Sequence, residues 1–390
     1  MLVLIAKETH GGEARVAATP ETVRQLVKRG AEVMVEPGAG ESSLASDAEY
    51  QEAGARLGDD YDAADVVLCV RPPDEARARR LHAGAAVIGF LNPFKNDDFV
   101  RAMVERKVTT LSMELVPRIT RAQKMDALSS QASIGGYKAV LIAAYHLPKY
   151  FPLLMTAAGT VKPAHVVVMG AGVAGLQAIA TAKRLGAVVE ASDIRPEVKE
   201  QIESLGGKFI PLPQRDESGA GKGGYAKEMS KEYLAEQRAI VKKHVARAHV
   251  VVTTALIPGR PAPLLVPEDM VQAMPPGGVI VDMAIEQGGN CELTELGREV
   301  VKHGVRIIGH PNLPSTLPAD ASMLYARNVY ALLDNCLDAE SSLKIDLADD
   351  VTGPTLLTHQ GEVFHAPTAE RLGLPRGQLP APETTEGKKR

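Results

Sequence analysis

Three glycines at a fixed spacing are the residues of this chain with the clearest chemical use. Gly170, Gly172 and Gly175 form a GxGxxG pattern in VVVMGAGVAGLQ, between a strand-like apolar run and a run with helical periodicity. The first glycine permits a tight turn, the second lets a pyrophosphate approach the backbone, and the third lets helix and strand pack closely. Free N–H groups at the helix start, including those of Val173 and Ala174, can bind the phosphate charge. The pattern predicts a dinucleotide site.

An acidic residue follows these glycines at the distance that such a site requires. Asp193 ends the next strand-like run, AVVEASD, and lies about 20 residues beyond the glycine turn. A carboxylate there accepts a hydrogen bond from the 2′-OH of NAD and repels the 2′-phosphate of NADP. Ile194 and Arg195 come next, and the arginine can weaken this preference. The complete context favours an NAD(H) site over the alternative that the glycines serve packing alone.

The composition is typical of a globular protein with little net charge. The 390 residues are 45% hydrophobic and 24% charged, with a formal net charge of −4. Binding to nucleic acid or to an anionic membrane surface is not indicated, because both need clustered positive charge. The three cysteines, Cys69, Cys291 and Cys336, form no CxxC pair, so we expect neither a disulfide framework nor a metal site.

Neither a signal peptide nor direct membrane insertion is expected. The N-terminal apolar run is short and has no basic residues before it. The most hydrophobic stretch, from Ala139 to Gly159, is interrupted by two prolines, a histidine and a lysine, which a membrane-spanning helix tolerates poorly. These features predict a cytoplasmic protein.

Strand-like and helix-like segments alternate along most of the chain. The strand-like runs are apolar throughout, which is typical of parallel sheets covered on both faces. We therefore predict an α/β protein with two doubly wound Rossmann-like domains and a nucleotide cleft between them. A late helix, from Ala319 to Leu337, is expected to return to the first domain. The predicted division is 1–125 plus 315–373 for the first domain, 126–314 for the NAD(H)-binding domain, and 374–390 for a flexible tail.

Long segments of the chain resemble domain I of the proton-translocating NAD(P) transhydrogenases, the NAD(H)-binding component of that family. The resemblance begins in PRITRAQKMDALSSQASIGGYKAV. It continues through GAGVAGLQAIATAKRLGAVVEASDIRP, KGGYAKEM, GGVIVDMAIEQGGNCELT and HPNLPSTLPADAS. Because these strings are long and occur in the family's order, the resemblance covers essentially the whole chain.

The resemblance implies a function and a set of partners. NADH bound by this chain would pass hydride to NADP⁺ on another subunit, as in a Si/Re-specific, proton-translocating transhydrogenase (a translocase). The chain would be active only with NADP(H)-binding and membrane-spanning subunits, which would hold it at the inner membrane. A homodimer is also implied.

By this resemblance, the family's nicotinamide-site residues correspond to Arg118, Gln123, Asp126 and Ser129. The groups of Gln123 and Ser129 match the donors and acceptor of a carboxamide. Arg118 and Asp126 can pair and fix the loop, or polarise the surroundings of the ring. The alternative is that these are ordinary loop residues and a helix N-cap, for which DALSSQ is well suited.

A second glycine-rich segment, SGAGKGGYAKEM from Ser218 to Met229, is predicted to be a mobile lid over bound nucleotide. Tyr225 would be its contact, since it is a rigid aromatic residue with a hydroxyl group. The alternative is the tip of a hairpin without a binding role.

Alanine dehydrogenases are the nearest competing family, because KETHGGEARVAATPE resembles their N-terminal pattern as well. Such an enzyme moves a proton in addition to a hydride and needs an acid/base residue beside its substrate. Where that family has a histidine and a lysine, this chain has Asn92 and Arg71, neither of which titrates usefully. Transhydrogenation needs no such group, so the sequence favours it. A non-catalytic NADH-binding protein is the third alternative, and the roles of His10, Arg15, Asp282 and Asn312 stay open.

Overall fold

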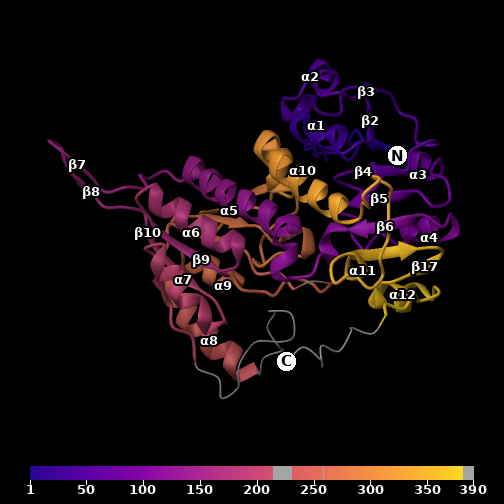
Figure 1. Ribbon diagram of the computed structural model, residues 1–390. Helices are drawn as coiled ribbons and strands as arrows, with labels where there is room; N and C mark the ends of the chain where they lie inside the picture. Colours follow the sequence, from indigo (N-terminus) through magenta and orange to yellow (C-terminus); the bar gives the residue numbers. More distant parts are fainter. Residues whose placement is uncertain (214–230, 258, 381–390) are drawn as a thin grey trace, which may run out of the picture. The chain divides into compact units, whose positions relative to one another are not determined.

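The computed structural model describes residues 1–213, 231–257 and 259–380 (Figure 1). The chain divides into two compact units. The first contains Met1–Gln131 and the described residues from Leu317 onward, and the second is Ala132–Thr316. The first boundary between the units, between Gln131 and Ala132, lies within the first two turns of helix α5 (Ala127–His146). The sequence-based boundary, in comparison, lies between residues 125 and 126.

The first unit is built on an eight-stranded sheet. Six strands run parallel in the spatial order β3-β2-β1-β4-β5-β6. Beyond β6 the sheet continues with β16, which is antiparallel to β6, and then with β17, which is antiparallel to β16. The strands are β1 (Leu2–Ile5), β2 (Glu32–Val35), β3 (Arg56–Leu57), β4 (Val66–Leu68), β5 (Ala86–Gly89), β6 (Thr109–Ser112), β16 (Leu356–His359) and β17 (Glu362–Val363).

Helices cover both faces of this sheet, as successive residues of β1 show. Val3 and Ile5 are buried in one apolar cluster, whereas Leu2 and Leu4 are buried in another. Because neighbouring side chains of a strand point to opposite faces, both faces must be covered. The helices of this unit are α1 (Pro20–Lys28), α2 (Asp47–Glu52), α3 (Glu75–Ala78), α4 (Asp97–Glu105), α10 (Pro318–Asn335), α11 (Thr352–Thr355) and α12 (Ala366–Leu372), with 3₁₀ turns η1 (Glu41–Ser43), η2 (Met113–Leu115) and η3 (Thr120–Met125).

The second unit repeats this plan with a seven-stranded sheet. Its order is β11-β10-β9-β12-β13-β15-β14, parallel except for β14. The strands are β9 (His165–Met169), β10 (Val188–Ser192), β11 (Lys208–Phe209), β12 (Val250–Thr253), β13 (Val279–Asp282), β14 (Glu299–Lys302) and β15 (Val305–Ile308). Val166 and Val168 face one cluster, and Val167 and Met169 face the other.

Most of α5 belongs to the second unit, together with α6 (Val173–Arg184), α7 (Lys199–Ser204), α8 (Lys231–Val245), α9 (Glu268–Ala273) and the 3₁₀ turns η4 (Pro196–Val198), η5 (Ile285–Gln287) and η6 (Leu313–Thr316). The six parallel strands of each sheet follow the doubly wound order 3-2-1-4-5-6, in which successive strands are added first on one side of the first strand and then, from the fourth strand on, on its other side. The predicted α/β class with two doubly wound domains is thereby confirmed. The reversal lies between β1 and β4 in the first unit and between β9 and β12 in the second.

The hydrophobic stretch after Ala139 forms the end of α5 and then a separate two-stranded hairpin. Strands β7 (Leu154–Thr156) and β8 (Gly159–Val161) pair only with each other and project from the rest of the second unit (Figure 1). In the described part of the chain, no helix combines the length and hydrophobicity that crossing a bilayer requires.

The C-terminal segment corrects one sequence-based expectation. A flexible tail was predicted from residue 374, but the backbone pairs with Val363 of β17 for several residues more. The N–H of Val363 donates to the carbonyl of Pro375 at 2.9 Å, and the N–H of Gly377 donates to the carbonyl of Val363 at 3.0 Å. An edge strand can recruit such a segment whatever its side chains are, so composition gave no sign of it. Residues 381–390 lie outside the described residues.

Candidate functional site

The glycine turn between β9 and α6 assigns a different task to each glycine. Gly170 has a φ of 101°, a conformation that favours glycine. A Cβ added at Gly175 would lie 1.8 Å from the carbonyl oxygen of Gly170, so this position needs glycine for packing. A Cβ added at Gly172 would meet no heavy atom within 4 Å. Backbone conformation therefore explains the first glycine and packing explains the third, but neither explains the second.

The turn is fixed at the reversal point of the second sheet. The N–H of Gly170 donates to the carbonyl of Ser192 at 2.9 Å, and the hydroxyl of Thr254 donates to the carbonyl of Gly170 at 3.1 Å. Ligands of doubly wound proteins bind at the carboxyl ends of the strands beside this point. The open side of Gly172 and the start of α6 are thus placed where a phosphate would be expected.

Asp193 lies beside this turn, directly after β10. Its Oδ2 accepts the N–H of Ala171 at 2.7 Å, which ties the carboxylate to the glycine turn. The other donors come from Arg195: its N–H and Nε donate to Oδ1 at 2.9 and 3.0 Å, and its Nη2 donates to Oδ2 at 3.0 Å. The structure therefore brings Asp193 to the turn and adds an ion pair with Arg195 that the sequence analysis did not foresee.

Helix α5 packs closely on α6 next to the turn. A Cβ at Gly136 would lie 2.1 Å from the carbonyl oxygen of Ala174, in the first turn of α6. A Cβ at the neighbouring Gly135 would instead meet the flexible end of Met283, at 2.9 Å. The glycine pair in SIGGYKAV is therefore explained at Gly136 by the close approach of two helix backbones.

Asp282, whose role was left open, has a structural role at the end of β13. It is fully buried, and its carboxylate accepts the hydroxyl of Thr253 at 3.1 Å. Three backbone N–H groups from the following loop, those of Ala284, Asn290 and Cys291, donate to it at 3.0, 2.8 and 2.9 Å. With its acceptor positions filled, Asp282 fixes this loop.

The four residues expected at the nicotinamide belong to the first unit. Asp126 caps α5, because its Oδ1 accepts the N–H of Ser129 at 2.9 Å and its Oδ2 accepts the hydroxyl at 2.6 Å. The helix N-cap considered from the sequence is therefore present. Gln123, within η3, and Arg118 are exposed. The role of these four residues toward a nicotinamide stays a prediction.

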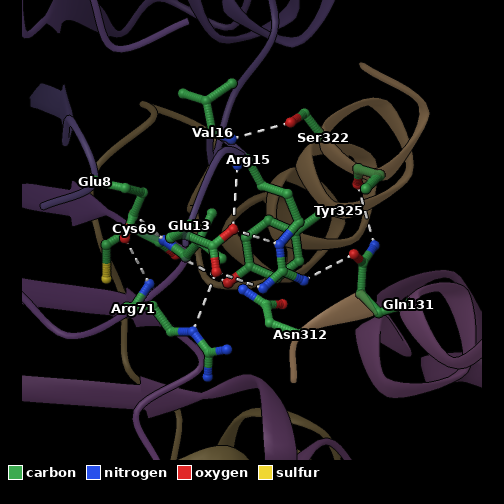
Figure 2. A network of polar contacts seen from close by, with 12 residues as sticks. Glu8, Glu13, Arg15, Val16, Cys69, Arg71, Gln131, Asn312, Ser322 and Tyr325 are labelled. Atoms are coloured by element: carbon green, nitrogen blue, oxygen red, sulfur yellow. Dashed lines mark hydrogen bonds and ion pairs between the residues drawn. The ribbon is translucent and has the colours of Figure 1, made fainter. Parts of the chain in front are cut away.

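A network of charged residues lies at the reversal point of the first sheet (Figure 2). The Arg15 side chain is only 3% exposed and pairs with Glu13 through two contacts of 2.7 Å. Its Nη1 also donates to Oε1 of Gln131 at 2.9 Å. Arg71 reaches the same Glu13 carboxylate at 3.2 Å. Arg15, whose role the sequence left open, is consequently a buried member of an ion-pair network.

Glu8, which the sequence analysis missed, joins β1 to β4 in this network. Its two carboxylate oxygens accept the N–H groups of Val70 and Arg71, at 2.6 and 3.1 Å. Burial raises the pKa of Glu8 to about 7. Burial also acts to raise the pKa of Glu13, but hydrogen bonding and the charge of Arg15 outweigh it and lower that pKa to about 2. The position of Glu8 just after β1 was the available signal.

The other residues named from the sequence are Asn92, Asn312, His10 and Tyr225. Asn92 has a φ of 51° and donates its N–H to Glu114 at 2.9 Å, while the N–H of Asn312 donates to Glu286 at 3.1 Å. His10 is exposed. Tyr225 and the predicted lid lie outside the described residues. Within the described residues, no group of three or more metal-ligating side chains is arranged to hold an ion.

Two doubly wound sheets, one with a complete glycine fingerprint at its reversal point, define a two-domain nucleotide-binding protein of the Rossmann type. Two family models match the chain, one after the other. "Alanine dehydrogenase/PNT, N-terminal domain" matches residues 4–135, and "Alanine dehydrogenase/PNT, C-terminal domain" matches residues 139–366.

Individual relatives separate the two branches of the family. An NAD(P) transhydrogenase alpha-subunit component of Rhodospirillum rubrum is 47% identical over 376 residues, covering 94% of this chain and 98% of the relative. "Alanine dehydrogenase" of Mycobacterium tuberculosis is 31% identical over 393 residues, covering 96% and 98%. A solved transhydrogenase from Sinorhizobium meliloti is 48% identical with a TM-score of 0.84, covering 93% of this chain and all of that one. The chain belongs to the alanine dehydrogenase/PNT family, on the side of the transhydrogenase alpha subunits.

Proposed function

We propose that this chain binds NAD(H) on the turn from Gly170 to Gly175 and transfers hydride between NADH and NADP⁺ held by a partner subunit. The observation that carries the proposal is the open space at Gly172, beside N–H groups at the start of α6. A dinucleotide site needs glycine there so that a pyrophosphate can approach the backbone. The reaction itself is proposed from the names of the more similar relatives, which are NAD(P) transhydrogenase alpha subunits.

The chain's own residues would bind and orient the cofactor, which when bound supplies the hydride. N–H groups of the glycine turn bind the pyrophosphate, and Asp193 accepts hydrogen bonds from the ribose, which favours NAD over NADP. Val173 and Ala174 at the helix start, with Ile194 and Arg195 after the strand, complete the proposed contacts, and Tyr225 is proposed to close over them. By resemblance, Arg118, Gln123, Asp126 and Ser129 orient the nicotinamide. Direct transfer requires the reacting carbons at roughly 3–3.5 Å.

An amino-acid dehydrogenase is the second candidate, and the side chains disfavour it. Asn92 cannot titrate, and Arg71 is held by Glu13 at 3.2 Å. The positions where alanine dehydrogenases have a histidine and a lysine therefore offer no general acid or base of the kind that amino-acid oxidation requires.

The proposal includes the assembly in which the chain works. "Subunit alpha" in the names of the relatives implies further subunits. We propose that these bind NADP(H), span the inner membrane and carry the protons of a Si/Re-specific transhydrogenase, and that two copies of this chain form a homodimer in the cytoplasm at the membrane surface.

Substitution at Gly172 tests the proposed site. Gly172→Ala places a methyl group where the phosphate is expected, so NADH binding, followed by nicotinamide fluorescence, should weaken at least roughly tenfold. Thermal unfolding should be unchanged, because the space is open. Gly11→Ala is the matched control, since an added Cβ there also meets nothing within 4 Å.

The reaction itself needs the partner. The unmodified chain should transfer hydride from NADH to NADP⁺ only when an NADP(H)-binding subunit is added, and at limiting NADH Gly172→Ala should slow this transfer by at least roughly tenfold, in proportion to its weaker NADH binding. Equal NADH affinity in the Gly172 and Gly11 variants, or turnover of alanine by the chain alone, would contradict the proposal.

A further inference from the structure

We propose that Arg195 sets the nucleotide selectivity of the ribose site by competing with the ribose for Asp193. The inference rests on the proposed NAD(H) site and goes further. The carboxylate that should select NADH is already bound by an arginine of the same chain. That arginine reduces the preference for NADH over NADPH.

Four donors fill the carboxylate of Asp193. Oδ1 accepts the N–H and Nε of Arg195, and Oδ2 accepts the N–H of Ala171 and the Nη2 of Arg195, all between 2.7 and 3.0 Å. An ionised carboxylate has about four acceptor positions. A ribose hydroxyl can therefore bind to Asp193 only if one of these donors leaves.

Of these donors, the guanidinium group of Arg195 is the one that can exchange. The N–H of Ala171 belongs to the glycine turn, which is fixed to β10 through Gly170 and Ser192. The N–H of Arg195 is part of the backbone that leads into η4. The Arg195 side chain, in contrast, is 26% exposed, whereas that of Asp193 is 6% exposed. Ribose binding must consequently break a bidentate ion pair, which weakens NADH binding.

The same guanidinium has the opposite effect on a 2′-phosphate. Asp193 alone would repel that phosphate, but a paired arginine offsets its charge. A guanidinium is also suited to bind a phosphate through two parallel hydrogen bonds. One side chain thus disfavours the 2′-OH of NADH and favours the 2′-phosphate of NADPH. Both effects lower the ratio of the Kd for NADPH to the Kd for NADH.

Removal of the side chain should therefore increase selectivity. We would measure the Kd of NADH and of NADPH by nicotinamide fluorescence for the unmodified chain and for Arg195→Ala. The Kd ratio should rise on the order of tenfold, because the ribose no longer competes and the phosphate loses its partner. Arg195→Gln, which keeps most of the side-chain volume, should give the same direction and replaces the alanine variant if that one unfolds.

Arg184→Ala is the matched control. Arg184 is exposed at the far end of α6, so its removal changes the net charge equally but should leave the Kd ratio unchanged. A second readout compares ADP with 2′-deoxy-ADP: the advantage of the 2′-hydroxyl should grow several-fold in Arg195→Ala. An unchanged or lower NADPH-to-NADH ratio in both Arg195 variants would overturn the inference. Failure of the unmodified chain to bind NADH would instead overturn the proposed function.

Discussion

Asp193 and Asp282 lie at the carboxyl ends of strands in the same sheet, and each carboxylate accepts four hydrogen bonds. The donors to Asp282 are three backbone N–H groups and the hydroxyl of Thr253, all held by the surrounding fold. Two of the donors to Asp193 belong to the long side chain of Arg195. Only Asp193 can therefore exchange a partner for a ligand, although the two aspartates resemble each other in sequence context.

Gln123 allows a test of the nicotinamide contacts at the scale of one residue. Because its proposed role is to orient the ring, Gln123→Ala should slow hydride transfer to NADP⁺ on a partner subunit by about ten- to a hundredfold. The Kd of NADH should change by less than about threefold. Single-turnover rates and NADH titrations measure the two quantities separately.

Lys124→Ala is the control for this test, since Lys124 is an exposed neighbour on the same 3₁₀ turn and should leave both quantities unchanged. A Gln123 variant that transfers hydride at the original rate would remove this residue from the proposed site.

Helices α5 and α6 provide the test at the scale of elements. Gly136→Ala would bring a methyl group to 2.1 Å from the carbonyl oxygen of Ala174, so the helices would have to separate. We expect a loss of roughly 2–4 kcal/mol in the free energy of unfolding. Gly135→Ala should cost less than about 1 kcal/mol, because Met283 can move and alanine favours the helix.

Urea denaturation measures the free energy of unfolding of the two variants, and each variant serves as the other's reference. Equal stability of the two would contradict the close approach at Gly136. The same contact holds the first turn of α6, so Gly136→Ala should also weaken NADH binding.

The sequence predicted the elements better than the contacts between them. Apolar runs alternating with helical periodicity predicted both doubly wound sheets, because strands covered on two faces lack polar positions. Local glycine and aspartate patterns predicted the turn and its acid. The ion pair of Arg195 with Asp193 and the hydrogen bonds that Glu8 accepts from the backbone after β4 depend on side-chain geometry. The hairpin of β7 and β8 and the pairing of Pro375 and Gly377 with β17 depend on backbone contacts, which leave no periodic signal.

The stability of the whole molecule should depend on pH through Glu8. Burial raises its pKa from 4.5 to about 7. A folded-state pKa above the unfolded value means that the stabilisation is fully present below pH 4.5 and is lost as the pH rises through 7. The free energy of unfolding should fall by about 1–3 kcal/mol over this range. Glu13, whose pKa is lowered to about 2, changes stability only at lower pH.

Denaturation of the unmodified chain and of Glu8→Gln across this pH range measures the effect. The variant has no carboxyl group to titrate at this position, so the unmodified chain should lose stability relative to the variant as the pH rises. Parallel profiles would contradict the prediction, because they would show that folding leaves the pKa of Glu8 unchanged.

The insertion of one unit into the other has a consequence for synthesis on the ribosome. Residues 132–316 emerge as one uninterrupted stretch and can complete their sheet while translation continues. The N-terminal unit must wait for Tyr325, Val329 and Leu332 of α10, which share a core cluster with Val3 and Ile5, and for β16 to cover the open edge of β6. The portion of the protein that is made first is thus finished last, and its unpaired edge is exposed to other nascent chains in the meantime.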